Sequence, residues 1–377
     1  MRSPTSRQLP ESYMRAALRL ARECPKLPHP NPWVGCVIVR DGRVVGKGFH
    51  HGAGTNHAEV EALLDAGPRA RDATLYVTLE PCCHHGRTPP CTDAILKAGI
   101  GEVYYAIKDP NPVVHGNSAR LLAKHGLRVH GGLCAGEATA LNEMYVKFQT
   151  TAMPFVTAKV AASLDGKIAT RTGQSKWLTD QNARRRARLL RIEHQAVLVG
   201  INTVLSDDPH LGPRQRGAAE PWRIVLDSHL RIPPDSKVVR SGKCMAACTA
   251  GASAAKKARL ERAGVRVLSF RGHQVPLPAL LRRLAKEEVI SLLVEGGGEV
   301  LGSFFDSRLV DRVCWFVSPI ILGSARSRAA VAGVGVARLD QACRIQSVTV
   351  EQVGNSWLLQ GKPRWRKSAG HRVNGSQ

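Results

Sequence analysis

Aromatic residues are scarce in this chain, since only 5% of its 377 residues are Phe, Trp or Tyr. No apolar run reaches the length of about 18 residues that a membrane-spanning helix needs, and residues 1–10 lack the apolar core of a signal peptide. We therefore expect a cytoplasmic protein with no membrane partner. The scarcity of aromatic residues also argues against an RNA-binding module that stacks bases on aromatic side chains.

Acidic residues are also few, with 30 Asp and Glu against 54 Lys and Arg, which gives a formal net charge of +24. This charge favours anionic partners without saying which. Residues 362–377 contain several Arg and Lys but no acidic residue. We expect this basic tail and residues 1–11 to be flexible and solvated, and we do not expect a nucleic-acid-binding arm.

The ten cysteines do not form the dense framework of a disulfide-rich secreted domain. Cys244 and Cys248 have a C-x3-C spacing, but no second pair lies nearby to complete a metal site. Outside the motif described next, we expect six cysteines to be reduced and mostly buried; they are Cys24, Cys134, Cys244, Cys248, Cys314 and Cys343.

The most informative motif combines His57 and Glu59 with two later cysteines that follow prolines, Cys82 and Cys91. One imidazole and two thiolates suit a tetrahedral zinc ion whose fourth position holds water, and zinc lowers the pKa of that water. Glu59 lies at the start of an apolar-periodic helix, where its carboxylate can take a proton from the water and pass it to a leaving amine. The same H-x-E and P-C pattern marks zinc-dependent nucleobase deaminases.

The choice of ligands is open from spacing alone, because the two cysteines are eight residues apart where most zinc deaminases have two. Cys83, His84 and His85 lie between them and can compete. An isolated H-A-E is typical of a helix start with a solvated Glu. Its combination with P-C and P-P-C after a predicted strand at 74–79 favours a catalytic site.

The second half of the chain alternates short apolar strands with helical patterns, which predicts a mainly parallel sheet covered by helices. We place the junction near 148–154 and expect a deaminase domain at 12–150 and a second domain at 151–361, with no internal repeats. The predicted elements are strands at 155–160, 196–199, 224–226, 291–294 and 313–317, and a helix at 180–194.

A glycine-rich turn follows the strand at 291–294 and leads into a helix. Such a turn lets backbone N–H groups approach a diphosphate, although a plain tight turn is an equal alternative. The helix at 180–194 carries a run of arginines that is usually a solvated face; they are Arg184, Arg185, Arg186, Arg188 and Arg191.

Residues 78–91, TLEPCCHHGRTPPC, resemble the deaminase half of the bifunctional riboflavin-biosynthesis deaminase-reductase family. Residues 30–39 and 46–50 are similar to that family's first strands. Its reductase half resembles residues 161–169, 175–179, 200–209 and 294–298, in the same order along the chain. The long insertion between the two cysteines is itself a trait of the family.

The resemblance implies a cytidine-deaminase-like α/β/α domain followed by a dihydrofolate-reductase-like α/β domain. It implies one zinc ion held by His57, Cys82 and Cys91, with Glu59 as the catalytic proton carrier, and NADPH in the second domain. Substrate contacts are implied at Ser175, Arg191, Leu211, Arg214 and Glu295, with Arg191 and Arg214 suited to a phosphate. NADPH contacts are implied at Ala161, Trp177, Thr203, Asp207, Ser228, Gly297, Gly298, Glu299, Val300, Leu301, Gly302 and Ser303.

We therefore expect a bifunctional enzyme that deaminates a phosphorylated diamino-pyrimidinone ribosylamine and then reduces its ribosyl group to ribityl with NADPH. We also expect a homo-oligomer. Two rival hypotheses are a nucleic-acid-modifying deaminase with an RNA-binding appendage, and a protein in which only one of the two domains is active.

Overall fold

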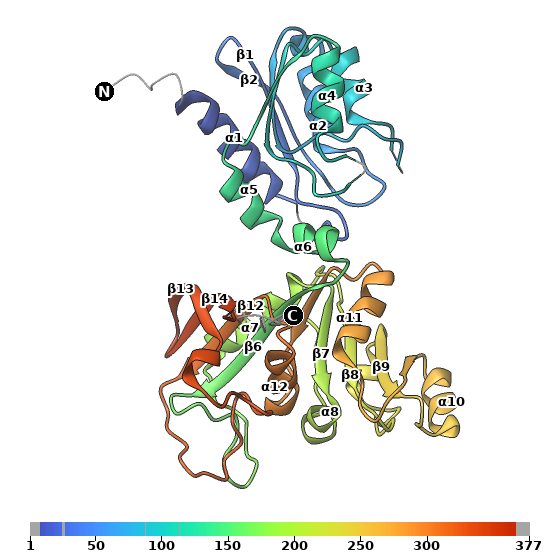
Figure 1. Ribbon diagram of the computed structural model, residues 1–377, viewed down its shortest axis with the longest axis vertical. Coiled ribbons are helices and arrows are strands. Elements are labelled where there is room, and N and C mark those ends of the chain that lie inside the picture. The colour runs from blue at the N-terminus through green and yellow to red at the C-terminus, as the bar shows by residue number, and fades with distance from the viewer. Residues whose placement is uncertain (1–7, 25–26, 87, 113, 367–377) are drawn as a thin grey trace, which may run out of the picture. The chain divides into compact units, whose positions relative to one another are not determined.

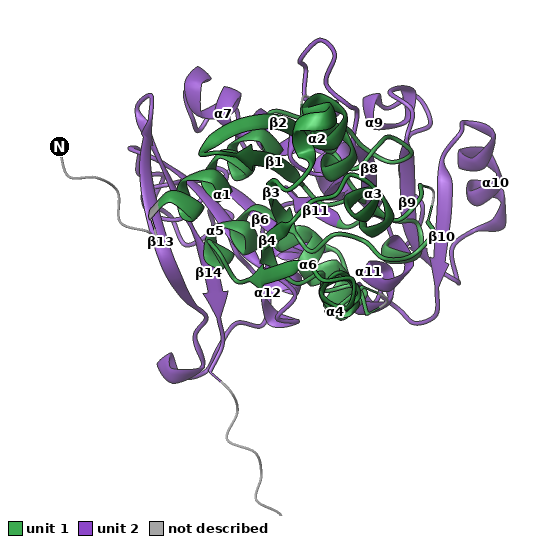
Figure 2. Ribbon diagram, turned by 90° about the horizontal axis from the view of Figure 1, so that it is seen from above, with its two compact units in different colours: residues 1–154, 285–290 green, residues 155–284, 291–377 purple. Residues whose placement is uncertain are grey.

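A computed structural model of the protein describes residues 8–24, 27–86, 88–112 and 114–366. The chain folds into two compact units, residues 1–154 with 285–290 and residues 155–284 with 291–377 (Figures 1 and 2). Most of the two ends that we expected to be flexible, 1–7 and 367–377, lies outside the described residues.

The first unit has a five-stranded sheet in the order β2-β1-β3-β4-β5, in which β3, β4 and β5 are parallel. Helices α2, α3 and α4 cover one face, while α1 and α5 cover the other (Figure 1). The prediction of an α/β/α domain is therefore confirmed. Its elements are α1 (Gln8–Ala21), β1 (Gly35–Arg40), β2 (Arg43–Phe49), α2 (Ala58–Ala66), β3 (Thr74–Leu79), α3 (Cys91–Lys97), β4 (Glu102–Ile107), α4 (Asn117–Lys124), β5 (Arg128–Gly131), α5 (Ala135–Leu141) and α6 (Glu143–Thr151).

The second unit has a nine-stranded sheet in the order β10-β9-β8-β7-β11-β6-β12-β14-β13. The strands from β10 to β12 are parallel, and β14 and β13 extend the sheet in antiparallel fashion. The predicted, mainly parallel sheet is confirmed. Its strands are β6 (Phe155–Ser163), β7 (Ala196–Gly200), β8 (Trp222–Leu226), β9 (Cys244–Thr249), β10 (Arg266–Phe270), β11 (Ser291–Val294), β12 (Arg312–Ser318), β13 (Arg344–Val353) and β14 (Ser356–Arg364).

Helices cover the parallel part of this second sheet. Leu190 of α7, Val204 of α8 and Leu260 of α10 pack into one core cluster with the sheet, and α11 and α12 lie on its other face (Figure 2). The N-cap of α7 is Asp180, whose side chain accepts a hydrogen bond from the backbone N–H of Ala183. The helices are α7 (Gln181–Ile192), α8 (Ile201–Asp207), α9 (Lys237–Arg240), α10 (Ala254–Arg262), α11 (Leu277–Lys286) and α12 (Gly298–Asp306).

Three expected boundaries need correction. Helix α1 begins at Gln8, inside the segment 1–11 that we expected to be flexible, because Met14, Ala17 and Leu18 bury its apolar face. Helix α6 runs across the predicted domain boundary at 150, and the two units divide after Pro154. At the other end, β14 extends to Arg364, so the basic segment begins later than 362.

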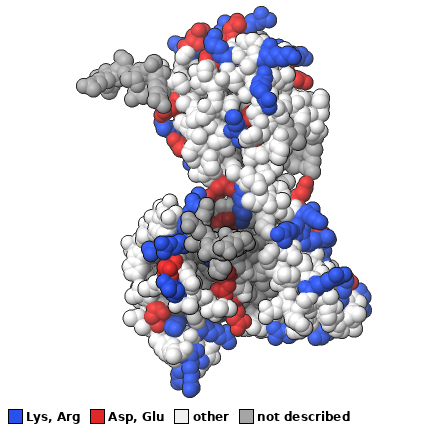
Figure 3. Space-filling view, in the orientation of Figure 1, with Lys and Arg blue, Asp and Glu red and all other residues white. Residues whose placement is uncertain are grey.

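Among the described residues, no helix is long and apolar enough to cross a membrane. The cysteines are free, and Cys24, Cys244, Cys248 and Cys314 are buried as expected, whereas Cys134 and Cys343 are partly exposed. On the face shown in Figure 3, Lys and Arg side chains are interspersed with Asp and Glu and do not form one continuous stripe.

Candidate functional site

The first unit brings together one histidine and two cysteines. His57 is the N-cap of α2, Cys82 follows β3, and Cys91 is the first residue of α3. The Nδ1 atom of His57 lies 3.2 Å from Sγ of Cys91 and 3.4 Å from Sγ of Cys82. Their ligand atoms all lie within 4.8 Å of one another, a donor set and spacing that fit a tetrahedral zinc ion.

The competing ligands considered from the sequence are not part of this cluster. Within the described part of the chain, the grouping of metal-ligating side chains contains His57, Cys82 and Cys91, without Cys83, His84 or His85. The insertion between the cysteines leaves Cys82 close to the start of α3, where its Sγ accepts a hydrogen bond from the backbone N–H of Cys91.

The two clustered sulfur atoms have very different acidities. Hydrogen bonds from Cys91 and from His57 lower the pKa of Cys82 to about 4, against the opposing effect of burial. The hydrogen bond to Cys82 and burial raise the pKa of Cys91. The two thiols therefore share a proton that a bound metal ion would displace, because metal ligands must be deprotonated.

Glu59 lies in the first turn of α2, two residues after His57, as predicted. It is only 3% exposed, and burial together with the negative charge of Cys82 raises its pKa to about 7. A carboxyl group that titrates near neutrality can both accept and donate a proton during turnover.

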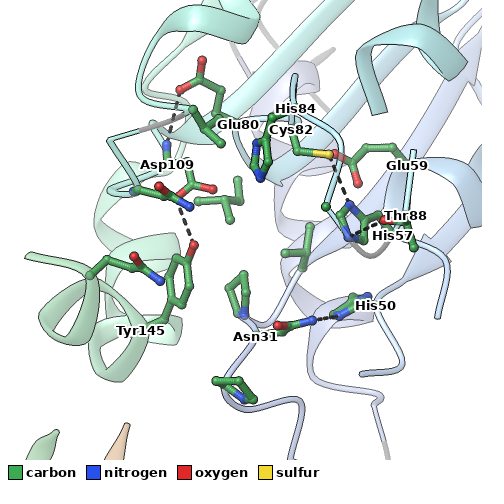
Figure 4. Close-up of a pocket in the computed structure, with 18 of the residues that line it drawn as sticks. Asn31, His50, His57, Glu59, Glu80, Cys82, His84, Thr88, Asp109 and Tyr145 are labelled. Atoms are coloured by element: carbon green, nitrogen blue, oxygen red, sulfur yellow. Dashed lines mark hydrogen bonds between the residues drawn. The ribbon is translucent and has the colours of Figure 1, made fainter. Parts of the chain in front are cut away.

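A pocket of about 440 Å³ opens beside this cluster (Figure 4). His57, Glu59 and Cys82 line one side of it, and Asp109 and Tyr145 line the other. A third wall comes from Asn31 and His50, whose side chains are joined by a 2.8 Å hydrogen bond. The pocket thus combines a metal-ligating cluster with polar side chains suited to a polar heterocycle.

The wall opposite the cluster depends on Glu80, which the sequence analysis did not single out. Its buried carboxylate accepts hydrogen bonds from the backbone N–H groups of Gly116 at 2.9 Å, Asp109 at 3.3 Å and Ala119 at 3.3 Å. The carboxylate of Asp109 in turn accepts a 3.0 Å hydrogen bond from the hydroxyl of Tyr145. Glu80 therefore fixes the segment that presents Asp109 to the pocket.

In the second unit, the residues expected to bind NADPH come from neighbouring parallel strands. Ala161 lies near the end of β6, Thr203 follows β7 and Ser228 follows β8. Gly297, after β11, is the N-cap of α12 and has no side-chain cap. A Cβ atom placed on Gly297 would lie 4.0 Å from Oγ1 of Thr203. The backbone N–H groups at the start of α12 are therefore not capped by a side chain, and the hydroxyl of Thr203 lies beside them. This arrangement at this edge of the sheet fits a diphosphate.

Two of the glycines expected to contact NADPH, Gly298 and Gly302 of α12, also allow another segment to approach the helix closely. A Cβ atom on Gly298 would overlap the carbonyl oxygen of Ala329, and one on Gly302 would overlap that of Ala332. These glycines let the backbone of 329–333 pack directly on α12. Leu301 is buried, with 2% of its surface exposed.

Arg191 and Glu295, both expected to contact substrate, are bound to each other. The guanidinium of Arg191 donates to the two carboxylate oxygens of Glu295 at 2.6 and 3.0 Å, and it donates to the carbonyl oxygen of Gly212 at 3.0 Å. Burial favours a protonated Glu295, but Arg191 and Lys159 outweigh it and lower the pKa to about 2. Arg191 therefore donates to Glu295 the two parallel hydrogen bonds that we expected it to donate to a phosphate.

Lys159 is a further residue that the sequence analysis missed. Its Nζ lies 3.5 Å from Glu295, and its side chain is 16% exposed. It lies in the middle of β6. A lysine among the apolar residues of that strand is the feature of the sequence that could have identified it.

The other predicted contacts lie in loops and at the end of α8. Leu211 and Arg214 have positive φ angles of 56° and 52°, which is uncommon for residues other than glycine. Arg214 is exposed, whereas Leu211 is buried. Asp207 forms an ion pair with Lys176 at 3.3 Å, and the exposed Trp177 stacks under Arg184. Ser175 is partly exposed.

Comparison with known proteins defines the class first. Residues 7–107 match the cytidine and deoxycytidylate deaminase zinc-binding region, and residues 154–359 match the RibD C-terminal domain. The chain is thus a deaminase-type zinc-binding domain joined to a reductase-type domain of the dihydrofolate-reductase-like fold, as predicted.

Closely similar proteins cover nearly the whole chain. The riboflavin biosynthesis protein RibD of Aquifex aeolicus is 41% identical over 94% of this chain and 98% of its own length, and that of Escherichia coli is 39% identical over 91% and 96%. RibD of Acinetobacter baumannii has a solved structure with a TM-score of 0.88 and 36% identity over 95% of this chain and all of the other. The chain belongs to the RibD family of bifunctional deaminase-reductases in riboflavin biosynthesis.

A second solved structure carries a more specific description. The diaminohydroxyphosphoribosylaminopyrimidine deaminase/5-amino-6-(5-phosphoribosylamino)uracil reductase of Thermotoga maritima has a TM-score of 0.82. It is 33% identical to this chain and covers 95% of it and 99% of its own length.

Proposed function

We propose that the first unit removes ammonia from a phosphorylated diamino-pyrimidinone ribosylamine and that the second unit reduces the ribosyl group of the product with NADPH. The observation that carries the first half is the cluster of His57, Cys82 and Cys91 beside the buried carboxyl group of Glu59. The same two reactions are named for the similar protein of Thermotoga maritima.

In this proposal, His57, Cys82 and Cys91 hold one zinc ion, which supplies an activated water as the nucleophile. Glu59 does not need to ligate the metal, because the other three side chains complete the protein's share of a tetrahedral site. Its role is to take one proton from that water and deliver it to a ring nitrogen, then to take the remaining proton of the added hydroxyl and pass it to the departing amine as the C–N bond breaks.

The pyrimidine ring would occupy the pocket beside this cluster. Asp109, held in place by Glu80 and Tyr145, faces the cluster across the pocket and can accept hydrogen bonds from ring N–H or amino groups. Asn31 can donate to or accept from the heterocycle edge. This arrangement orients the amino-bearing carbon towards Glu59.

For the reductase half, NADPH supplies the hydride when bound, and the protein's main task is to hold the reacting groups together. The start of α12 at Gly297, with Thr203 beside it, would hold the diphosphate. Glu295, kept ionised by Arg191 and Lys159, would bind hydroxyl groups of the sugar. Lys159, whose Nζ lies 3.5 Å from the carboxylate of Glu295, would lie near the same groups.

The phosphate of the substrate would meet Arg214 and Arg188. Arg188 lies three residues before Arg191 on α7, so the two side chains share one face of the helix. Burial and the nearby charges of Arg214, Arg191 and Arg184 lower the pKa of Arg188. A group of cations at this spacing is stabilised by a dianion.

The decisive experiment is incubation with the ribosylamine phosphate, first alone and then with NADPH, followed by mass analysis of each product. We expect loss of one amino group in the first reaction and a gain of two hydrogens in the second. An unchanged mass in the first reaction would refute the deaminase assignment. A second candidate, an RNA-modifying deaminase, predicts salt-sensitive RNA binding, and a filter-binding titration tests it directly.

A further inference from the structure

A buried cation in the second unit is not used by either reaction as proposed above. Among the described residues, the largest fully buried side chain is that of Arg223 on β8, which is 0% exposed. An arginine is seldom fully buried unless its charge is paired and its N–H groups have hydrogen-bond acceptors. The partners of Arg223 therefore indicate what this side chain does.

The guanidinium of Arg223 is bonded to three separate segments of the chain. Its Nε donates to the carbonyl oxygen of His210 at 2.8 Å, and its Nη1 donates to the carbonyl oxygens of Gly242 at 3.2 Å and Pro221 at 3.4 Å. Its Nη2 forms an ion pair with the carboxylate of Glu220, whose side chain is 42% exposed. Arg223 thus fixes the segment after α8 to the residues that precede β8 and β9.

A second arginine holds the segment after α8, residues 208–214. In addition to the bond from Arg223, this segment is bonded at Gly212, whose carbonyl oxygen accepts a hydrogen bond from Arg191 at 3.0 Å. The three residues before Arg214 are buried, whereas Arg214 itself is exposed. The two arginines therefore fix the backbone that leads to Arg214.

The backbone of this segment has an unfavourable conformation. Asp208, Leu211 and Arg214 have positive φ angles of 40°, 56° and 52°. Such angles are uncommon for residues other than glycine and persist where surrounding contacts enforce them. The bonds from Arg223 and Arg191 lie on either side of the buried Leu211 and are contacts of this kind. Loss of one of these bonds should let the backbone relax and move the side chain of Arg214.

The ion-pair partner of Arg223 also lies close to this segment. A Cβ atom added to Gly212 would lie 2.8 Å from Oε2 of Glu220 and 2.6 Å from Nδ1 of His210. A side chain at position 212 would therefore collide with the carboxylate that Arg223 holds. Arg223 thus acts on the segment directly, through its bond to His210, and indirectly, through Glu220.

We propose that Arg223 is a positioning residue, which keeps residues 208–214 in the backbone conformation that presents Arg214 to the phosphate of the substrate. The proposal rests on the proposed function, in which Arg214 and Arg188 bind that phosphate. Burial and the charges of Arg214 and of neighbouring arginines lower the pKa of Arg188, so the two cations lie near each other. A phosphate that bridges them needs both at a fixed spacing, which depends on the backbone at Arg214.

Arg223→Lys separates the effect of position from the effect of charge. Lysine keeps the positive charge but lacks the planar set of donors, so it cannot hold His210, Gly242 and Glu220 together. We expect the KM for the deaminated product of the first reaction and the Kd of ribose 5-phosphate to rise ~10-fold, the effect of losing one charge-assisted contact. The kcat and the KM for NADPH should stay unchanged. NADPH oxidation and calorimetric titration of the full-length protein measure these quantities.

Glu220→Ala distinguishes positioning from electrostatic attraction. Removal of an acidic residue should by itself favour an anionic ligand. Loss of the ion pair with Arg223 should instead weaken the binding of ribose 5-phosphate by roughly 3-fold, in line with a partly exposed pair. Glu261→Ala is the matched control, because Glu261 is 48% exposed on α10 and pairs with Lys257 at 3.9 Å. This control should not weaken binding.

Arg214→Gln tests the proposed function itself, and thermal unfolding confirms that each variant is folded. We expect Arg214→Gln to weaken ribose 5-phosphate binding at least as much as Arg223→Lys does. If Arg214→Gln weakens binding but neither Arg223→Lys nor Glu220→Ala does, Arg223 has a structural role alone and the positioning role is overturned. If Arg214→Gln binds ribose 5-phosphate as the wild type does, the phosphate assignment of Arg214 is wrong and the positioning role fails with it.

Discussion

Burial distinguishes Glu59 from the neighbouring acidic residue of α2, Glu61, which is partly exposed. We expect Glu59→Gln to retain the metal and to lower the rate of ammonia release by ~100-fold or more, because the variant cannot carry a proton. Metal content and ammonia release are measured on the same preparation. Glu61→Gln is the control and should behave like the wild type; near-normal turnover in Glu59→Gln would remove this residue from the mechanism.

The ligand set is tested by three serine substitutions. Cys82→Ser and Cys91→Ser should deplete bound zinc, because a hydroxyl is a much poorer ligand than a thiolate. Cys83→Ser is the control and should keep it, since Cys83 is outside the cluster. Elemental analysis after dialysis gives the answer, and the reverse pattern would assign the ligands differently.

The residues of the metal cluster could be proposed from sequence because each belongs to a short motif whose chemistry is explicit. Glu80 and Asp109 could not, since they meet only after β3 pairs with β4 and Glu80 binds the segment that follows. The contact between Arg191 and Glu295 was missed for a similar reason. Each was expected to face substrate, and 104 residues separate them along the chain.

At the scale of elements, the packing of 329–333 on α12 depends on Gly302. A methyl group there overlaps the carbonyl of Ala332, so Gly302→Ala must push the two backbones apart. We expect a loss of about 2 kcal/mol in unfolding free energy and weaker NADPH binding, because the displaced helix start is the proposed diphosphate site. Denaturant unfolding and a binding titration measure these effects. Gly251→Ala is the control, with nothing within 4 Å of the added atom.

The side chain of His194 links the end of α7 to β6 and makes the stability of this region depend on pH. Its Nδ1 lies 2.7 Å from the carbonyl of Leu190, its Nε2 lies 2.8 Å from the hydroxyl of Thr157, and burial lowers its pKa to about 4. Between pH 6.5 and 4 the unfolded chain binds a proton that the folded chain does not, so stability falls as pH falls.

We expect this one group to account for roughly 3 kcal/mol of the loss in unfolding free energy over that range. His194→Gln should flatten the pH dependence of unfolding. His273→Gln, which changes an exposed histidine, should leave the slope as it is. If the unfolding free energy depends on pH equally in the wild type and in both variants, His194 does not titrate as described.

The regular elements were predicted best where burial leaves a clear pattern. The predicted strands at 74–79 and 291–294 agree with β3 and β11 at both ends, and the predicted helix at 180–194 contains α7. Strand β13 was missed because nine of its ten residues are exposed, so apolar burial gave no signal. The end of β14 was included in the basic tail because Lys362 and Arg364 lie there and no acidic residue follows them.

At the scale of the whole molecule, the two units have separate sheets and separate core clusters. We therefore expect the two reactions to be lost independently. Glu295→Gln should lower NADPH oxidation by ~10-fold or more, because the ionised carboxylate is lost, while ammonia release from the first substrate stays normal. NADPH absorbance and ammonia are followed in parallel.

The reciprocal measurement completes this test. Glu59→Gln supplied with the deaminated intermediate should oxidise NADPH at the wild-type rate. A fall in both activities in either variant, with unchanged thermal unfolding, would contradict independent sites. Independent loss of the two activities would argue against the hypothesis that only one domain is active.

The bond between Arg191 and Glu295 has a thermodynamic consequence. A free arginine side chain explores many rotamers, worth about 2 kcal/mol of entropy, and this freedom is surrendered when the second unit folds. A ligand that binds later contacts a guanidinium and a carboxylate that are already ordered. The conformational entropy lost on binding then comes mostly from the ligand.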